Sequence, residues 1–304
     1  MHILENDQLL VQIDDRGAEL TRLYDKASGK ELLWSGDPSF WGYHAPVLFP
    51  LVGMVNHREF RYHGKTYPMG QHGFARQSDF TCLPDASGSS VSHVLRSDEA
   101  SRAIYPFDFE LVINHTLADR QLYVKWSVRN PSAEETLYFS IGGHPAFAVP
   151  PVPADSAADG FVPAKKEDCY VLFPGKESLR YILVDLSVTA ADPDHVYTLP
   201  LDHGYLKLDR HLFDIDTFIF EDGQIEEASL CGPDRVPYLT LRCPGFPRFG
   251  LWTKSDDAPF VCLEPWYGRL DDRGFTGELP EKTGILSLAP DASFEASYTI
   301  DIPE

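Results

Sequence analysis

His144 and Glu264 each occur in a local sequence that could position the side chain for proton transfer. His144 lies within Gly142-Gly-His-Pro-Ala-Phe147, at the end of a strand-like run. The glycines let the backbone come close to another group, and the proline pushes His144 toward an extended conformation. Glu264 follows the apolar run that begins at Phe260. Histidine and glutamate are common general acids and bases, so this pair could perform acid–base chemistry.

Each of these two residues also has a structural interpretation. His144 could be a hydrogen-bonded histidine at a strand-to-loop corner. A carboxylate at the end of a buried strand is costly to leave unpaired. Glu264 is therefore either in a salt bridge, for example with Arg269, or held as a base, and its local sequence leaves both interpretations open.

Further groups typical of a sugar site occur nearby in the sequence. In Gln71-His-Gly-Phe-Ala-Arg76, His72 stands beside a glycine and Arg76 offers a forked donor, although His72 could be an ordinary loop histidine. Trp266 and Tyr267 could stack on a sugar ring or pack in the core. Imidazole, carboxylate, guanidinium and aromatic groups together favour a carbohydrate ligand.

The composition limits the classes of partner. There are 46 acidic and 26 basic residues, and the formal net charge of −20 disfavours nucleic acid and anionic membranes. A neutral small molecule fits better. The five cysteines are scattered without metal-finger spacing, which indicates reduced thiols. The N-terminus shows no secretory pattern and no run approaches about 20 apolar residues, so we expect a cytoplasmic protein.

Short β-rich runs punctuated by proline and glycine recur along the chain and predict the elements that position these groups. The clearest is a hairpin of 109–117 and 121–128, in which Leu122, Val124, Trp126 and Val128 share one face. No segment shows a convincing helical period, and Pro145–Pro163 is the one long stretch expected to be irregular. Other expected strands are 8–14, 20–24, 47–52, 60–67, 91–95, 137–141, 181–184, 217–220, 238–243, 248–253, 260–263 and 294–302. The predicted fold class is all-β, a large antiparallel β-sandwich.

Four stretches together carry a resemblance to a known family. They are His72-Gly-Phe-Ala-Arg76, the Gly-Gly-His-Pro-Ala-Phe stretch, Leu212-Phe-Asp-Ile-Asp-Thr-Phe-Ile-Phe220 and Cys262-Leu-Glu-Pro-Trp-Tyr-Gly-Arg269. In this order and spacing they resemble the aldose 1-epimerase (galactose mutarotase-like) superfamily, and in particular its LacX-type branch. The resemblance spans almost the whole chain. It implies a single β-sandwich domain over residues 1–304, in agreement with the strand pattern.

The resemblance also implies roles for individual residues. His144 matches the histidine that protonates the ring oxygen of the sugar, and Glu264 matches the base that takes the proton of the anomeric hydroxyl. The expected substrate-binding residues are His72, Arg76, Asp216 and, as an aromatic wall, Trp266; the match at Asp216 is loose. One departure is Met54, at a position where many relatives carry a basic residue.

The implied activity is interconversion of the α and β anomers of a hexose. One acid and one base suffice, so no cofactor and no metal is expected. For its role His144 should be at least partly protonated near neutral pH, and a nearby carboxylate would raise its pKa. Two alternatives stay open: a non-catalytic sugar-binding or sensing protein, and a mutarotase for hexose 6-phosphates, for which Arg58, Arg61, Arg76 and Arg269 are candidate phosphate ligands. A glycoside hydrolase is disfavoured, because that chemistry normally uses two carboxylates.

Overall fold

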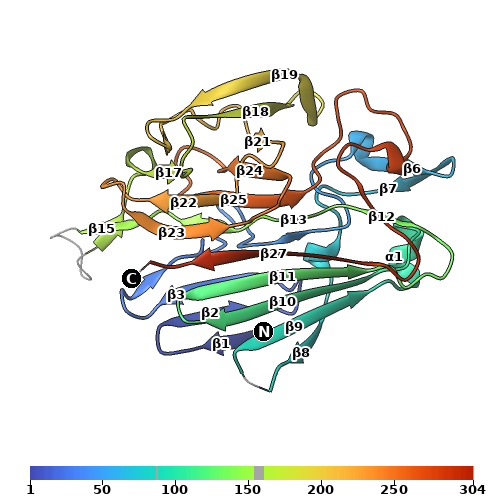
Figure 1. The fold of residues 1–304 in the computed structure, drawn as a ribbon, viewed down its shortest axis with the longest axis horizontal. Coiled ribbons are helices and arrows are strands. Elements are labelled where there is room, and N and C mark those ends of the chain that lie inside the picture. The colour runs from blue at the N-terminus through green and yellow to red at the C-terminus, as the bar shows by residue number, and fades with distance from the viewer. Residues whose placement is uncertain (87, 154–160, 304) are drawn as a thin grey trace.

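The structure is a computed structural model that describes residues 1–86, 88–153 and 161–303. Its regular secondary structure consists mainly of short antiparallel strands (Figure 1). The strands are β1 (His2–Glu5), β2 (Leu9–Ile13), β3 (Leu20–Asp25), β4 (Lys30–Glu31), β5 (Val47–Leu48), β6 (Glu59–Tyr62), β7 (Lys65–Pro68), β8 (Thr81–Pro84), β9 (Ser90–Arg96), β10 (Glu110–Ala118), β11 (Gln121–Arg129), β12 (Leu137–Phe139), β13 (Ile141–Gly143), β14 (Ala146–Ala148), β15 (Pro151–Pro153), β16 (Phe161–Pro163), β17 (Tyr170–Leu172), β18 (Ser178–Asp185), β19 (Ala190–Pro200), β20 (Tyr205–Lys207), β21 (Phe218–Phe220), β22 (Glu227–Cys231), β23 (Pro237–Arg242), β24 (Arg248–Trp252), β25 (Phe260–Tyr267), β26 (Leu286–Leu288) and β27 (Ser293–Asp301). The helical segments are α1 (Glu99–Ile104) and the 3-10 turns η1 (Asn56–Arg58), η2 (Ala75–Gln77), η3 (Lys166–Asp168) and η4 (Leu279–Glu281).

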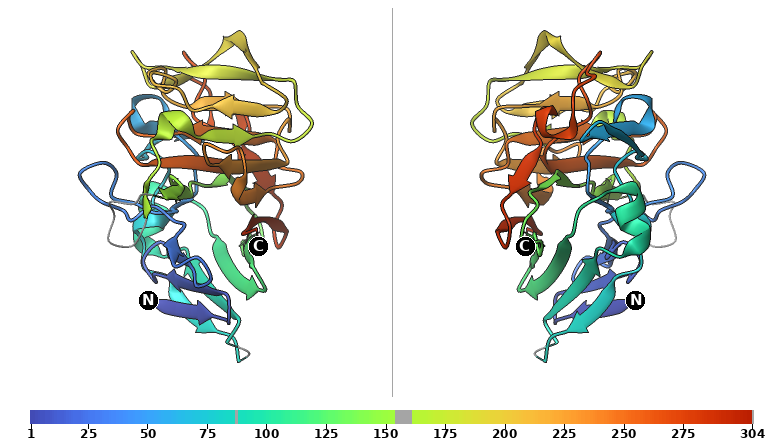
Figure 2. Two further views of the ribbon diagram at one scale, coloured as in Figure 1. Left: turned by 90° about the vertical axis from the view of Figure 1, so that its left-hand side faces the viewer. Right: turned by 90° about the vertical axis from the view of Figure 1, so that its right-hand side faces the viewer.

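Two large sheets form the body of the molecule. One has nine strands in the order β20-β17-β22-β23-β27-β11-β10-β9-β8, and the other has eight, ordered β19-β18-β21-β24-β25-β13-β5 with β14 also paired to β25. In Figure 1 strands β18, β21, β24 and β25 lie above β27, β11, β10 and β9. The side views in Figure 2 place the yellow strands at one end and the blue N-terminal strands at the other. The predicted all-β antiparallel sandwich is confirmed.

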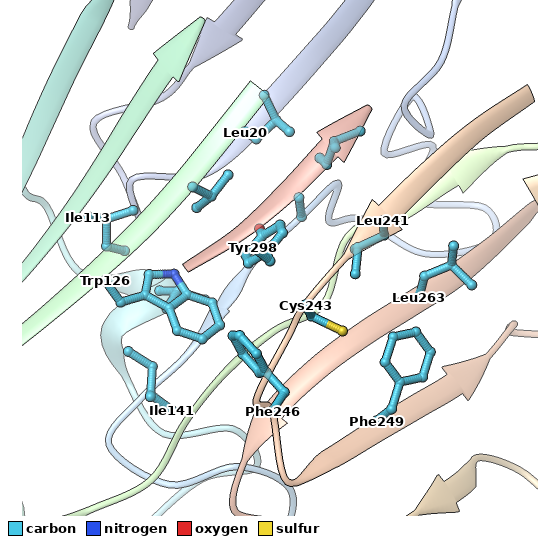
Figure 3. Close-up of a cluster of buried hydrophobic side chains, with 14 of the residues drawn as sticks. Leu20, Ile113, Trp126, Ile141, Leu241, Cys243, Phe246, Phe249, Leu263 and Tyr298 are labelled. Atoms are coloured by element: carbon cyan, nitrogen blue, oxygen red, sulfur yellow. The ribbon is translucent and has the colours of Figure 1, made fainter. Parts of the chain in front are cut away.

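The main core lies between the two sheets. Figure 3 shows Trp126 and Tyr298, from the nine-stranded sheet, beside Phe246 and facing Phe249 and Leu263 from the eight-stranded sheet. The Trp126 ring centroid is 5.8 Å from that of Phe246 and 5.5 Å from that of Tyr298. The same apolar cluster includes side chains from Leu4 to Ile302, so both ends of the chain contribute to one core.

The hairpin expected from the alternating pattern is present. Strands β10 and β11 pair in continuous register from Glu110 opposite Arg129 to Ala118 opposite Gln121. The four side chains expected on one face of β11 are all buried: Leu122, Val124, Trp126 and Val128. Period-two alternation is a reliable guide here because one face of this sheet packs on the core.

Several predicted strands are divided or shortened. The run 60–67 forms the hairpin β6–β7, and 47–52 is a strand only over Val47–Leu48. The run 137–141 splits at Ser140 into β12, which pairs with β26, and β13, which pairs with β25. The sequence does not reveal such breaks. When a buried run changes from one neighbouring strand to another, its residues remain equally hydrophobic.

A short helix was not predicted. Helix α1 begins after Asp98, whose carboxylate accepts a hydrogen bond from the backbone N–H of Ser101, while the Ser101 hydroxyl accepts one from the N–H of Asp98. This reciprocal capping stabilises helix α1, which has no buried apolar face. None of the helices in the described ranges is long and apolar enough to cross a membrane.

The expectation that Pro145–Pro163 is irregular is wrong for its described parts. Strand β14 pairs with β25, and β15 pairs with β16 in a two-stranded ladder. Residues 154–160 of this stretch lie outside the described residues.

His115 on β10 is a buried histidine outside any site, and it predicts a pH dependence of stability. Burial lowers its pKa to about 3, whereas an unfolded histidine titrates near 6.5. Between these values the unfolded chain binds a proton that the folded protein does not, so stability present above pH 6.5 is lost as the pH falls, by up to about 1.4 kcal/mol per unit. We expect the thermal unfolding midpoint to fall from pH 7 to pH 4, and to fall less in His115→Gln. An exposed control, His203→Gln, should keep the wild-type slope; a His115→Gln slope equal to wild type would contradict the prediction.

Candidate active site

A cavity of about 330 Å³ opens on the face of the eight-stranded sheet that points away from the main core. Side chains alternate across this sheet: Ile141, Phe249 and Leu263 point into the core in Figure 3, so their neighbours point to the cavity. The cavity is lined by Trp41, Gly53, Met54, Gln71, His72, Arg76, His144, Val184, Thr189, Asp216, Thr217, Ile219, Trp252, Lys254, Glu264, Trp266 and Leu270. All six sequence-predicted site residues are in this set, although they come from four distant stretches.

The centre of the cavity is the contact between His144 and Glu264. Gly142 pairs with Trp266 and Ala146 with Cys262, so His144, between β13 and β14, lies opposite Glu264 on β25. The imidazole Nε2 is 3.3 Å from a carboxylate oxygen, and the side chains are 8% and 1% exposed. This strand register, rather than sequence proximity, makes them neighbours.

Burial determines the protonation of this pair. It raises the pKa of Glu264 well above its usual range, and the charge of Asp216 adds to the shift. It lowers the pKa of His144 to about 3. The expectation that a carboxylate would keep His144 partly charged is therefore wrong, because desolvation is the largest cause of the shift. Both shifts favour the neutral forms of the two groups, in which the carboxyl group is a proton donor and the imidazole a proton acceptor.

Aromatic rings exclude water from His144. The ring of Trp41 stacks on the imidazole with centroids 4.7 Å apart, and Trp252 meets it edge-on at 5.4 Å. Neither tryptophan was predicted as a site residue. The signal was weak: Trp41 lies in a stretch rich in aromatic residues, proline and glycine, which is equally typical of a surface loop.

His72 is held in one tautomer. The backbone N–H of Gly53 donates to its Nδ1 at 3.1 Å, and the N–H of His72 donates to the Gly53 carbonyl at 2.7 Å. Burial lowers the pKa of His72 well below its usual value. The neutral ring must carry its proton on Nε2, because Nδ1 is an acceptor, and Nε2–H is then free to donate to a ligand hydroxyl.

The glycine beside His72 is required by close packing. Gly73 has φ +72°, and a Cβ there would stand 2.2 Å from the carbonyl oxygen of Phe49. Only glycine allows this approach, which brings the His72 segment against the loop that follows β5.

A variant of His72 should separate binding from chemistry. We expect His72→Ala to raise KM for the sugar at least as much as it lowers kcat, because the role expected for the Nε2–H donor is to orient the ligand rather than to transfer its proton. Steady-state kinetics with a mutarotation assay measures both constants. A change in thermal stability with unaltered kinetics would instead identify His72 as an ordinary loop histidine.

Arg76 and Asp216 face the cavity with opposite charges. Arg76 donates to the Gln71 carbonyl at 2.9 Å and lies over the Tyr43 ring at 4.8 Å. Asp216 has φ +68° and accepts a hydrogen bond from the Thr217 hydroxyl at 2.8 Å. A forked donor and a carboxylate acceptor suit a ligand with many hydroxyl groups.

Trp266 forms a floor of the cavity because glycines flank it. A Cβ on Gly142 would stand 2.6 Å from the indole, and one on Gly250 would stand 2.5 Å from it. The two glycines are on the strands either side of β25 and leave room for the ring to lie across the sheet.

Gly250→Ala should therefore displace Trp266. Overpacking of this kind costs about 1–3 kcal/mol, so we expect a lower free energy of unfolding and weaker sugar binding. Gly70→Ala is the matched control, since a Cβ there meets no atom within 4 Å. Denaturant titration and calorimetry measure the two effects. If Gly250→Ala and Gly70→Ala had equal free energies of unfolding and equal sugar affinities, this role of Gly250 would be contradicted.

The possible salt bridge between Glu264 and Arg269 is not formed. Arg269 Nε lies 2.9 Å from Glu221 and its Nη1 lies 2.6 Å from Asp272. Tyr267 packs against Phe246 in the main core, with centroids 4.7 Å apart, and does not line the cavity.

Of the four arginines proposed as phosphate ligands, only Arg76 lines the cavity. Arg58 lines a neighbouring hollow, which shares Met54 and Thr189 with the cavity. Arg61 lies 3.7 Å from Glu278. The other cation at the cavity is Lys254, which is exposed and was not predicted.

The fold is a large antiparallel β-sandwich, and the buried imidazole–carboxylate pair in its cavity is of a kind suited to acid–base chemistry on a small hydroxylated ligand. Residues 1–167, which include His72 and His144, match the family model of aldose 1-epimerase. The chain belongs to the aldose 1-epimerase family. This membership supports a general mutarotase or epimerase role with a sugar as the substrate.

Relatives cover the whole chain, including the part that carries Glu264. The chain is 29% identical to the chromosomal protein LacX of Lactococcus lactis subsp. lactis, over 98% of each chain. It is 32% identical to a galactose mutarotase related enzyme of Lactobacillus acidophilus, covering 100% of this chain and 97% of that one with a TM-score of 0.89. A galactose mutarotase-like protein of Lactobacillus casei is 30% identical over 100% of both chains, with a TM-score of 0.86.

Proposed function

We propose that this protein is a mutarotase that interconverts the α and β anomers of an aldohexose. The observation that carries the proposal is the 3.3 Å contact between His144 and Glu264 at the centre of a cavity lined by hydrogen-bonding and aromatic groups. We also propose that residues 1–304 act as one domain, because the core cluster draws side chains from Leu4 to Ile302.

The reaction needs one proton donor and one proton acceptor next to each other. Opening the hemiacetal transfers a proton to the ring oxygen O5 and removes one from the hydroxyl O1, and the C1–O5 bond breaks. Both oxygens are bonded to C1, so the groups that serve them must be neighbours, as His144 and Glu264 are. Rotation about C1–C2 and the reverse transfers then close the ring as the other anomer.

The single proton on the pair supplies this chemistry. Because burial favours the neutral forms of both groups, the proposed resting state has this proton on Glu264. Its transfer to His144 as the sugar binds gives an imidazolium donor for O5 and a carboxylate acceptor for O1. Hydroxyl groups of the sugar replace water around Glu264, and hydrogen bonds to a carboxylate lower its pKa. The assigned roles are His144 as acid and Glu264 as base.

The remaining groups hold the sugar. The Nε2–H of His72 and the guanidinium of Arg76 donate to hydroxyl oxygens, Asp216 accepts, and Trp266 covers an apolar face of the ring. A pocket retained only for sugar sensing would need the donors and the aromatic wall, but it would not need a buried acid–base pair whose burial carries an energetic cost.

A mutarotase for hexose 6-phosphates is the second candidate. Arg76 and the exposed Lys254 both line the cavity, and either could bind a phosphate group. The experiment that separates the candidates is a polarimetric mutarotation assay across glucose, galactose and their 6-phosphates. Acceleration of the neutral sugars supports the first candidate, and acceleration of the phosphates alone supports the second. Sugar binding by calorimetry without any acceleration would overturn both in favour of a sensor.

A further inference from the structure

A buried thiol lies beside the proposed acid–base pair. Cys262 precedes Glu264 by two residues on β25, so both side chains point to the same face of the sheet. One ligand atom from each of His144, Cys262 and Glu264 lies within 4.8 Å of the other two, and all three residues are buried. The proposed mutarotation makes no use of this thiol.

The three groups leave buried polar atoms without partners. Both carboxylate oxygens of Glu264 and the Nδ1 of His144 make no hydrogen bond to any described residue. Buried polar atoms are ordinarily satisfied, and leaving one unpaired costs about 1–3 kcal/mol. The unpaired oxygens of Glu264, a residue that is only 1% exposed and lines the cavity, are therefore available to a ligand bound there.

The spacing suits a tetrahedral cation. Two ligands about 2.05 Å from a tetrahedral zinc ion lie about 3.3 Å apart, and the nitrogen of His144 is 3.3 Å from the oxygen of Glu264. The longer zinc–sulfur bond, about 2.3 Å, places a thiolate somewhat farther from its neighbours. The spacing of His144 and Glu264 fits two corners of a tetrahedron, and Cys262, whose ligand atom lies within 4.8 Å of both, can supply the third. A water or a sugar oxygen from the cavity can take the fourth.

The donor types favour zinc over hard cations. Thiolate and imidazole ligands select Zn²⁺ and similar borderline ions, whereas Mg²⁺ and Ca²⁺ prefer oxygen. Asp216 adds negative charge close enough to influence Glu264, and the formal net charge of −20 attracts cations to the protein.

We propose that His144, Cys262 and Glu264 form a binding site for Zn²⁺, and that the bound ion reversibly inhibits the enzyme by occupying its acid and base. Binding replaces the thiol proton of Cys262 and the carboxyl proton of Glu264, and both are released to solvent. The inhibitory part of the proposal rests on the proposed mutarotase function; the binding part does not.

Two other clusters are less suited to a cation. In the group of Asp15, Cys82 and His93, the Asp15 carboxylate already bonds the N-terminal ammonium at 2.8 Å and His93 at 3.1 Å. In the group of His211, Asp214 and Asp256, the imidazole of the exposed His211 is already 3.0 Å from Asp214. Cys82→Ser serves as the matched control for Cys262→Ser.

The test uses metal-free full-length protein treated with a chelator. Its mutarotase activity is measured first without metal, so that failure of the proposed function is recognised independently. Zn²⁺ binding is then followed by calorimetry, and Co²⁺ binding by its thiolate charge-transfer absorption. We expect one ion to bind wild type and Cys82→Ser with this absorption, and Cys262→Ser to lose the absorption and to bind zinc at least about 10- to 100-fold more weakly.

Inhibition gives a second readout. Zinc should compete with the sugar in wild type, and a chelator should restore activity. Cys262→Ser should keep its mutarotase rate without metal and need at least about 10-fold more zinc for the same inhibition. Equal zinc affinity of wild type and Cys262→Ser, or loss of binding only in Cys82→Ser, would overturn the proposed site.

Discussion

The Glu264→Gln variant is expected to interconvert anomers about 10²- to 10⁴-fold more slowly than wild type, the usual contribution of a general base. Glutamine has nearly the shape of glutamate but cannot accept the O1 proton. Because burial raises the pKa of Glu264 and so favours its neutral form, the neutral amide should disturb folding little. Polarimetry measures the rate, and thermal unfolding verifies the fold.

The control for this variant is a carboxylate of the same cavity that accepts no proton in the reaction. Asp216→Asn should change sugar binding more than turnover, since its proposed contribution is one hydrogen bond to the sugar. If folded Glu264→Gln kept a near-wild-type rate while Asp216→Asn lost it, the base would be Asp216.

The His144→Asn variant is expected to lose a similar factor in rate, about 10²- to 10⁴-fold. Asparagine removes the proposed proton donor to O5 and the imidazole against which Trp41 stacks at 4.7 Å. If His144 and Glu264 act as one unit, as proposed, the double variant should be about as slow as the slower single variant rather than slower by the product. An exposed histidine variant, His211→Asn, should retain the wild-type rate. If the fold reduction in rate of the double variant equalled the product of the two single reductions, His144 and Glu264 would not act as a coupled pair.

The same pair predicts the pH profile. In the proposed mechanism His144 and Glu264 share one transferable proton. The rate should therefore fall at acidic pH, where both groups are protonated, and at alkaline pH, where neither holds that proton. The pKa of His144, at about 3, places the acidic limit at low pH, and the raised pKa of Glu264 moves the alkaline limit above the ordinary range of a carboxyl group. A profile that titrates at about 6.5, as a solvent-exposed histidine would, would contradict the buried pair.

Short-range patterns predict much of the fold. Alternating residues define the β10–β11 hairpin, because one face of each strand contacts the core and the other contacts solvent. They do not show that the run 137–141 passes from one sheet to another at Ser140, since both halves are buried and equally apolar. Helix α1 is missed because its stability comes from capping by Asp98 and Ser101 rather than from a periodic apolar face.

The sequence predicts some residues of the candidate site and misses others, because only some of them stand in a distinctive local sequence. Residues in unusual local sequences, such as His144 between glycines and a proline, are recognisable from the order of amino acids alone. Trp41 and Trp252 are not, because an aromatic residue in a loop or strand looks the same whether it packs in the core or covers a site. Lys254 is equally hidden, since exposed lysines are common.

The amino-acid sequence by itself determined that this is an antiparallel β protein of the aldose 1-epimerase type, and it singled out His144, Glu264, His72, Arg76, Asp216 and Trp266. The packing of the sheets brings Glu264 to His144 rather than to Arg269, and brings Cys262 close to both. The same packing sets the directions in which the pKa values of His144 and Glu264 shift. A pKa depends on how much water surrounds a group, and the number of rings and strands that exclude water from His144 is a property of the packed sheets.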